Sequence, residues 1–224
     1  MRYRSALICF IGTDGTGKST LAKLITRDLA LKGLRVKRTY GRHQYFLSRV
    51  AIILGRRIFL KNRDPFKDYD QYLSEKRGTY KKFSRLIDFY ISLLMTEYLI
   101  QIFFKVIIPL RLGCNVVSDR YLYDTIINDV AIDRNLPLDD VKKIYKKYEK
   151  RVPCPDVAFL IQIPENVAMQ RKNDIPSPSY IRIRNELYNQ FTEREEIIPL
   201  DGTLPLTQLQ DEVLSILKQR LDIT

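Results

Sequence analysis

The sequence has few of the residues that build disulfide frameworks and zinc sites. Its 224 residues include three cysteines and one histidine. Cys9, Cys114 and Cys154 are odd in number, widely spaced and form no CxxC pair, which argues against both kinds of site. Unpaired thiols fit a reducing compartment, so we expect a cytoplasmic protein.

The sequence also lacks a long uninterrupted apolar run. The longest apolar stretch, residues 86–112, is interrupted by Asp88, Glu97, Gln101, Lys105, Pro109 and Arg111. The apolar run near the start, residues 6–11, has six residues and leads into a glycine-rich loop instead of a cleavage site. We therefore expect neither a transmembrane segment nor a signal peptide.

The composition is that of a folded domain. Hydrophobic residues make up 45% and charged residues 29% of the chain, which excludes a disordered tail, a collagen-like rod and a low-complexity linker. No linker or internal repeat interrupts the sequence. We expect residues 1–224 to form a single domain around one sizeable core.

Positive charge is concentrated in the first half of the chain. Residues 1–100 carry 21 Lys and Arg against 8 Asp and Glu, whereas residues 101–224 carry 17 against 18. Most of the surplus lies between Lys32 and Lys82. Such a region attracts phosphates, nucleic acid or an anionic membrane surface, but a solvated basic face that aids solubility explains it equally well.

Short apolar runs alternate with segments of helical spacing. The predicted strands cover residues 6–11, 35–40, 115–118, 157–163 and 197–200. The predicted helices cover residues 18–32, 45–60, 84–110, 138–150, 164–172, 181–194 and 206–221. This alternation predicts an α/β protein with a parallel five-stranded sheet covered by helices on both faces.

A phosphate-binding motif follows the first predicted strand. Residues 12–19, GTDGTGKS, match GxxxxGK[ST] between a strand and a helix. In such a loop the backbone N–H groups surround phosphate oxygens, Lys18 contacts the β- and γ-phosphates, and Ser19 binds Mg²⁺. The predicted ATP-binding residues are Gly12, Thr13, Asp14, Gly15, Thr16, Gly17, Lys18, Ser19 and Thr20.

An acidic and a basic residue follow the third predicted strand. Asp119 stands at its carboxyl end, where ligands bind in open α/β sheets, so we predict that it serves the magnesium ion with Ser19. The alternative is an aspartate that caps a turn. Arg120 is predicted to face an acceptor phosphate, and the alternative is an ordinary surface ion pair.

Together these segments resemble the thymidylate kinase family. The resemblance rests on TDGTGKST at 13–20, DRY at 119–121, PDVAFLI at 155–161, PENVAMQRK at 164–172 and IPLDGT at 198–203. It covers most of the chain in order and is weak between residues 40 and 110. It implies a three-layer P-loop NTPase fold and magnesium-dependent transfer of the ATP γ-phosphoryl group to a nucleoside monophosphate, with dTMP the first candidate.

The resemblance also implies roles for single residues. It places Asp14 beside the acceptor sugar and the transferring phosphoryl group, with Arg120 and Tyr121 on the acceptor side. Arg171 would lie in a lid, residues 171–182, that covers the donor. Because the family's basic loop position is Gly15 here, we expect the catalytic lid charge to come from Arg171, Lys172, Arg182 or Arg184; the alternative is that these are solvated helix charges.

The acceptor-side region, residues 40–110, departs from the family pattern. The RxPG segment is absent, so Arg42 is only a candidate phosphate ligand. Met95 and Leu99 stand where the family places a Phe and an Arg that read the base. Leucine cannot hydrogen-bond to a pyrimidine edge, so we expect weaker discrimination between dTMP and other monophosphates.

Three further polar residues have open roles. Asp124 and Asp129 occupy places in the family's SxxAYQ segment and either bind an acceptor hydroxyl group or face solvent. His43 is interpreted as a plain loop residue, with phosphate contact as the alternative.

The apolar helix of residues 84–110 must be buried on two sides. The sheet can cover one side, and either the basic helix of residues 45–60 or a second subunit can cover the other; the resemblance favours a homodimer through such helices. The apolar positions of the helix at 84–110 cover more than one face, and Phe103 and Phe104 are the residues we would test as outward-facing. Two alternatives to a nucleoside monophosphate kinase stay open. One is a P-loop kinase for another phosphorylated or hydroxyl acceptor. The other is an ATP-binding module whose basic half binds nucleic acid or an anionic surface.

Overall fold

The computed structural model contains the predicted parallel sheet, with five strands in the order β2-β3-β1-β4-β5. It describes residues 5–45, 84–132, 136–172 and 175–221. The strands are β1 Leu7–Ile11, β2 Val36–Tyr40, β3 Asn115–Asp119, β4 Val157–Gln162 and β5 Ile197–Asp201. All four neighbouring pairs run parallel, and the predicted strand ends are confirmed to within one residue.

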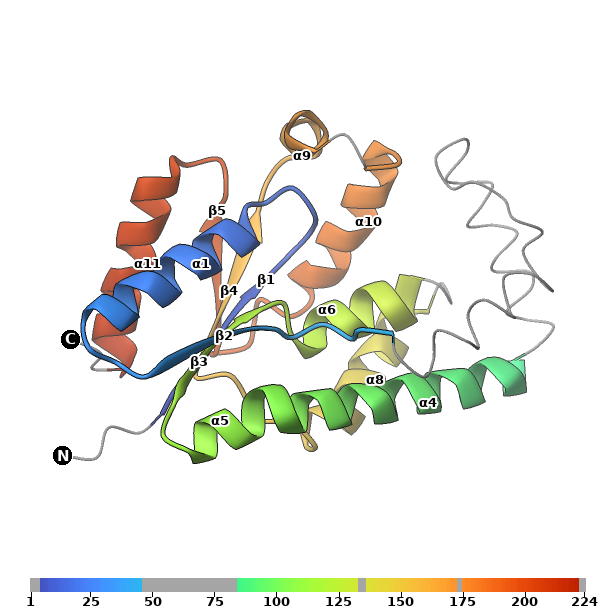
Figure 1. The fold of residues 1–224 in the computed structure, drawn as a ribbon. Helices are drawn as coiled ribbons and strands as arrows, with labels where there is room; N and C mark the ends of the chain where they lie inside the picture. Colours follow the sequence, from blue (N-terminus) through green and yellow to red (C-terminus); the bar gives the residue numbers. More distant parts are fainter. Residues whose placement is uncertain (1–4, 46–83, 133–135, 173–174, 222–224) are drawn as a thin grey trace.

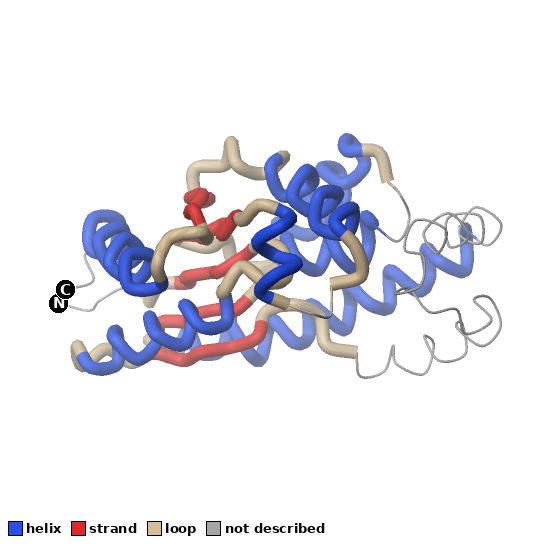
Figure 2. The backbone as a smooth tube through the Cα atoms, turned by 90° about the horizontal axis from the view of Figure 1, so that it is seen from above, coloured by secondary structure: helices blue, strands red, loops and turns tan. Residues whose placement is uncertain are grey.

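Helices cover both faces of the sheet, as the tube in Figure 2 shows. They are α1 Lys18–Leu31, α4 Ser84–Ile102, α5 Ile108–Arg111, α6 Leu122–Ile126, α8 Leu138–Glu149, α9 Glu165–Arg171, α10 Pro178–Asn189 and α11 Leu206–Leu221. Two π-helical turns, η1 Phe103–Ile107 and η2 Ile127–Ala131, extend α4 and α6. The three-layer α/β fold predicted from the sequence is confirmed (Figure 1).

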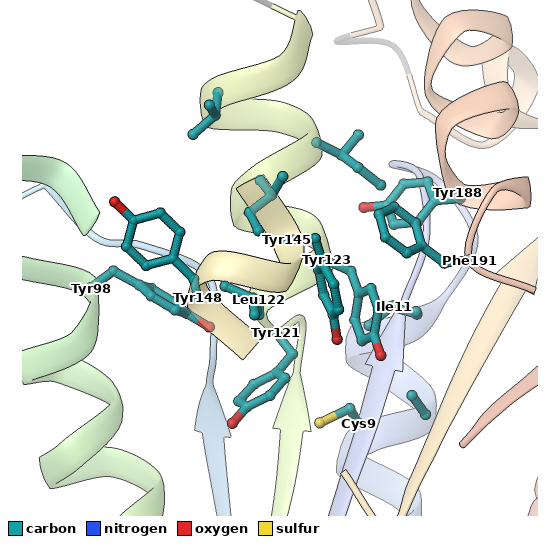
Figure 3. Packing of buried hydrophobic residues seen from close by; sticks show 14 of the residues in the cluster. Cys9, Ile11, Tyr98, Tyr121, Leu122, Tyr123, Tyr145, Tyr148, Tyr188 and Phe191 are labelled. Carbon is teal, nitrogen blue, oxygen red and sulfur yellow. The ribbon is translucent and has the colours of Figure 1, made fainter. Parts of the chain in front are cut away.

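Alternating side chains of the strands divide the core into two layers. Ile8 and Phe10 of β1 pack on one face with α1 and α11. Leu7, Cys9 and Ile11 pack on the other face with α4, α6, α8 and α10. The second layer is rich in tyrosine, and Figure 3 shows the labelled rings spread between α4, α10 and the sheet. Burial on both faces explains why these strands read as continuous apolar runs.

The long helical rod α4–η1–α5 passes through Pro109 instead of ending there. A π-helical turn precedes the proline, and the Ile108 N–H bonds to the Phe103 carbonyl. The rod ends at Leu112 and Gly113, where φ is +74°. By length and composition alone, residues 88–111 could cross a membrane, a criterion that core helices of soluble proteins also meet.

Two predictions about the second half of the chain need correction. The helix predicted at 181–194 is α10 and covers Pro178–Asn189, because the Ser177 hydroxyl caps it and Pro178 fits its first turn. Half of the predicted lid, residues 171–182, is therefore helical.

The α6–η2 segment after the DRY residues 119–121 was not predicted as a helix. The helix predicted at 45–60 lies almost wholly outside the described residues.

Candidate functional site

The phosphate-binding loop lies where the motif predicts, between the end of β1 and the start of α1. Its glycines have positive φ angles of 132° at Gly12, 83° at Gly15 and 88° at Gly17. A Cβ atom on Gly12 would lie 2.5 Å from the carbonyl oxygen of Ile161, so this position has no room for a side chain. Because glycines adopt these φ angles without strain, the loop can turn so that the N–H groups of the first turn of α1 are presented to an anion.

Lys18 is folded back onto this loop. Its buried ammonium group donates to the Thr13 carbonyl and to Thr16 Oγ1, the latter at 2.8 Å. Burial and the nearby charge of Arg120 lower the Lys18 pKa to about 7, although neighbouring carboxylates oppose the shift. The side chain is therefore placed to gain its charge when phosphate oxygens arrive.

Asp119 and Ser19 offer oxygen ligands beside the loop. Asp119 is the last residue of β3 and is buried, and its Oδ1 has no hydrogen-bond partner among the described residues. Ser19 is exposed on the first turn of α1. A buried carboxylate oxygen without a donor fits a Mg²⁺ ion that takes its other ligands from water, phosphate and a hydroxyl group such as that of Ser19. The described residues contain no cluster of three or more His, Cys, Asp or Glu that could hold a metal ion.

Arg120 is fixed in both its backbone and its side chain. Its φ is +72°, rare for a residue with a Cβ, and its N–H and C=O bond to the Phe10 carbonyl and the Ser118 hydroxyl at 2.8 and 2.7 Å. Its buried guanidinium pairs with Asp14 and, at 3.0 Å, with Asp124. Arg120 is thus part of a buried network and not of an ordinary surface pair.

Asp14 joins the phosphate-binding loop to two other elements. One carboxylate oxygen pairs with Arg120, and the other accepts a 2.9 Å hydrogen bond from the Tyr180 hydroxyl of α10. Burial alone would raise the Asp14 pKa, but the charges of Arg120 and Lys18 outweigh it and lower the pKa to about 2. Asp14 is therefore ionised at neutral pH. Tyr180 was not predicted as a site residue, because the helix predicted from the sequence begins only at residue 181.

Tyr121 lies apart from the residues that the resemblance groups with it. Its ring is buried in the tyrosine-rich core, and its hydroxyl donates to the Pro153 carbonyl at 2.8 Å (Figure 3). The side chain alternates away from Arg120 and faces the core, so the structure does not bring it to the acceptor side.

Asp124 and Asp129 do not face solvent, and both are already engaged by the protein. Asp124 accepts from Arg120, from the Tyr121 N–H at 2.9 Å and from the Tyr188 hydroxyl at 2.6 Å. Asp129 pairs with Arg42 through two contacts of 2.6 and 3.0 Å. The solvent-facing alternative is therefore wrong, because both carboxylates are buried and each pairs with an arginine. A contact with an acceptor hydroxyl group stays a prediction.

His43 is not a plain loop residue. Its side chain is fully buried, and its Nε2 lies 3.2 Å from Oε2 of Glu97 on α4. The backbone N–H of His43 donates to the Thr125 hydroxyl at 3.1 Å. Burial lowers the His43 pKa, while the hydrogen bond to Glu97 opposes the shift. In the sequence Glu97 stands out only as a charged residue that interrupts an apolar stretch. Its position on the buried face of α4 is the signal that could have pointed to a buried partner.

The base-reading positions of the family are occupied by core residues. Both residues belong to α4. Met95 is fully buried in the core layer that α4 forms with α6, α8 and α10, and Leu99 is half-buried against the same layer. Neither side chain carries a group that donates or accepts a strong hydrogen bond. The polar side chains found near the loop after β2 are instead the pairs Arg42 with Asp129 and His43 with Glu97.

Of the lid candidates, Arg171 borders a cleft next to the phosphate-binding loop. Its Nη1 donates to the Gly202 carbonyl at 2.7 Å. The cleft has a volume of about 370 Å³ and is lined by Thr16, Gly17, Thr20, Leu21, Ile161, Arg171, Gly202, Thr203, Leu204, Pro205, Leu206 and Leu209. Arg184 is buried against Asn128 and stacks on the Tyr180 ring, and Arg182 is exposed.

Comparison with known proteins agrees with this geometry. The chain is 24% identical to a probable thymidylate kinase 2 of Saccharolobus solfataricus over 98% of each chain. It is 24% identical to a probable thymidylate kinase of Archaeoglobus fulgidus over 97% of each, and 27% identical to a thymidylate kinase of Thermosipho africanus over 96% of this chain and 98% of the relative. No family model matches the chain. The fold, the phosphate-binding loop and this full-length similarity together support a nucleotide kinase.

Proposed function

We propose that this protein transfers the γ-phosphoryl group of ATP to a nucleoside monophosphate, with dTMP as the first candidate acceptor. The observation that carries the proposal is the contact between Arg120 and Asp14. It brings the residue expected to bind an acceptor phosphate against the loop expected to bind the donor phosphates. Two phosphate sites at one edge of a sheet are what a phosphoryl transfer between nucleotides requires.

On the donor side the loop N–H groups and Lys18 bind the phosphates, and the cleft beside Arg171 accepts the base and sugar of ATP. Ser19 and Asp119 would hold Mg²⁺, which neutralises charge on the phosphate oxygens when it is bound. Lys18 adds a positive charge where negative charge spreads during transfer. The chain's contribution is therefore positioning and electrostatic stabilisation, without a covalent intermediate.

On the acceptor side Arg120 would bind the monophosphate and Asp14 would orient its sugar. Arg42 stays a candidate phosphate ligand, although Asp129 already engages its guanidinium group. Catalytic roles are proposed for Lys18, Asp14 and Arg171. Tyr121 is left out of the proposed acceptor site because its side chain faces the core.

A kinase with a different acceptor is the second candidate function. It is favoured by the apolar, core-facing side chains of Met95 and Leu99 at the family's base-reading positions. The test is kcat/KM for dTMP, dUMP, UMP, CMP, AMP and GMP with ATP. We expect turnover of several monophosphates with dTMP among them. Strong preference for dTMP alone would overturn the expected loss of discrimination, and turnover of none would overturn the proposed function.

We also propose a cytoplasmic homodimer built on the α4–η1–α5 rod. Phe89, Ile100, Phe103 and Phe104 are 42–69% exposed along it, which is unusual for large apolar side chains on a monomer's surface. A mass near twice 26.4 kDa by light scattering at micromolar concentration would support the dimer, and a mass near 26.4 kDa would refute it. The basic stretch that could bind nucleic acid lies mostly outside the described residues.

A further inference from the structure

Asp124 is a buried carboxylate for which the phosphoryl transfer has no direct use. Its side chain is fully buried in α6, and three groups from different elements donate to it. These are the Arg120 guanidinium after β3, the Tyr121 N–H at the start of α6, and the Tyr188 hydroxyl of α10. A carboxylate that accepts several charge-assisted or strong hydrogen bonds holds its partners in one geometry.

Asp124 holds one of the two terminal nitrogens of the Arg120 guanidinium group. Nη2 pairs with Asp14, which belongs to the glycine-rich loop, and Nη1 contacts both Asp124 and the Gly12 carbonyl, the latter at a longer 3.3 Å. The Nε–H of Arg120 makes no hydrogen bond to a residue that the structure describes. This donor stays available for an acceptor phosphate only while Nη1 and Nη2 are held in place.

We propose that Asp124 is a positioning residue that fixes Arg120 for the acceptor phosphate, and that Tyr188 links this arginine to helix α10. The effect of Asp124 on turnover rests on the proposed kinase function, whereas its effect on the orientation of Arg120 does not. The Tyr188 hydroxyl is fully buried, and burial together with Asp124 raises its pKa well above the ordinary value, so it donates at every physiological pH.

The chain offers a matched control for Tyr188. Tyr123 is also a buried tyrosine of the same core layer, and its hydroxyl donates to a carboxylate, Glu196, at 2.8 Å. Glu196 contacts Arg194 instead of Arg120. Tyr123→Phe and Tyr188→Phe therefore remove the same kind of bond from the same core, and only the second removes one that leads to Arg120 (Figure 3).

The kinetic test is a double-mutant cycle on Asp124→Asn and Arg120→Lys, with ATP and the best monophosphate of the panel. We expect Asp124→Asn to lower kcat/KM for the monophosphate about 30-fold and to leave KM for ATP within twofold. We expect the same change to have little further effect in the Arg120→Lys protein, because its partner is already gone. Equal effects in both backgrounds would show that Asp124 does not act through Arg120.

A second readout needs no substrate and separates this inference from the proposed function. The Nε–H signal of Arg120 in the nitrogen-15 NMR spectrum, assigned by its loss in Arg120→Lys, reports how firmly the guanidinium is held. We expect it to shift or broaden in Tyr188→Phe and Asp124→Asn and to stay unchanged in Tyr123→Phe. An unchanged signal in Tyr188→Phe and in folded Asp124→Asn would overturn the positioning role. A wild-type protein without turnover would count against the kinase alone.

Discussion

The proposed donor and acceptor sides of this site are built from different kinds of groups. On the donor side, backbone N–H groups, glycines with positive φ and one lysine make the phosphate site. On the acceptor side, side chains from distant parts of the chain form buried pairs, such as Arg42 with Asp129 and His43 with Glu97. A loop that binds through its backbone N–H groups has a short sequence signature, whereas a network of side chains from distant segments has none.

The largest expected effect is on the donor side, where one side chain carries the charge. Lys18→Ala should lower phosphoryl transfer about 10³-fold or more, because a fixed positive charge on the β/γ-oxygens is lost. The fold should remain, since the strand–loop–helix backbone does not depend on this side chain. Circular dichroism and turnover on the same sample decide the matter. A folded variant with near-normal turnover would remove Lys18 from the mechanism.

The next effect concerns the junction between the two sides. A Cβ atom on Gly41 would lie 2.2 Å from Ser118 Oγ and 2.4 Å from the Arg120 carbonyl oxygen. Gly41→Ala should therefore push apart the loops after β2 and β3 and lower the free energy of unfolding by about 3 kcal/mol. Gly33→Ala is the control: its φ is +81°, no atom lies within 4 Å of the added carbon, and we expect about 1 kcal/mol.

Urea unfolding of both glycine variants measures this difference. If Gly41→Ala proves no more costly than Gly33→Ala, the two loops are not packed as closely as the structure has them.

A smaller effect is expected from the Arg42–Asp129 pair. The Asp129 side chain is 2% exposed and that of Arg42 is 24% exposed. Arg42→Met leaves a buried carboxylate with only the Tyr45 hydroxyl as a described donor, so we expect about 2–3 kcal/mol of destabilisation. Asp129→Asn should lower the free energy of unfolding by less, because the Arg42 side chain that loses its partner still reaches solvent.

The surface pair of Lys143 and Asp140 serves as the reference for these unfolding measurements. Its side chains are 75% and 45% exposed, and Lys143→Gln should leave the unfolding midpoint unchanged. Equal midpoints for Arg42→Met and Lys143→Gln would mean that the acceptor side is not organised by its buried pair.

The smallest effect is a proton taken up when the donor site fills. The Lys18 pKa of about 7 lies below the ordinary value of 10.5, so at pH 8 most molecules have a neutral lysine. Bound phosphates favour the charged form, and uptake should approach one proton at pH 8 and vanish toward pH 6. Calorimetry of ATP binding in two buffers of different ionisation enthalpy measures it. Lys18→Arg, always charged, is the control; equal wild-type heats in both buffers would contradict the lowered pKa.

The sequence was sufficient for the sheet and the donor site for a physical reason. Strands buried on both faces read as apolar runs, and the phosphate-binding loop combines a motif with that context. Asp119 and Arg120 were predicted as site residues because ligands gather at the carboxyl ends of parallel strands. The structure confirms their place at the end of β3, and their roles stay predictions.

The partners on the acceptor side could not be found in the same way. Arg42 and Asp129 are 87 residues apart in the chain, and His43 and Glu97 are 54 apart. No periodicity or local spacing links such pairs, and only the packing of α4 and η2 against the segment after β2 brings them together. Tyr180 was missed for a local reason, since Ser177 and Pro178 start α10 earlier than its apolar spacing indicates.

The central claim is that the two sides form one active site. The most direct test follows the labelled γ-phosphoryl group of ATP in the presence of Mg²⁺ and dTMP, alone and with the other monophosphates. The account predicts label in a nucleoside diphosphate with the wild-type protein and almost none with Lys18→Ala. Label that stays in ATP, or that appears only in inorganic phosphate, would contradict it.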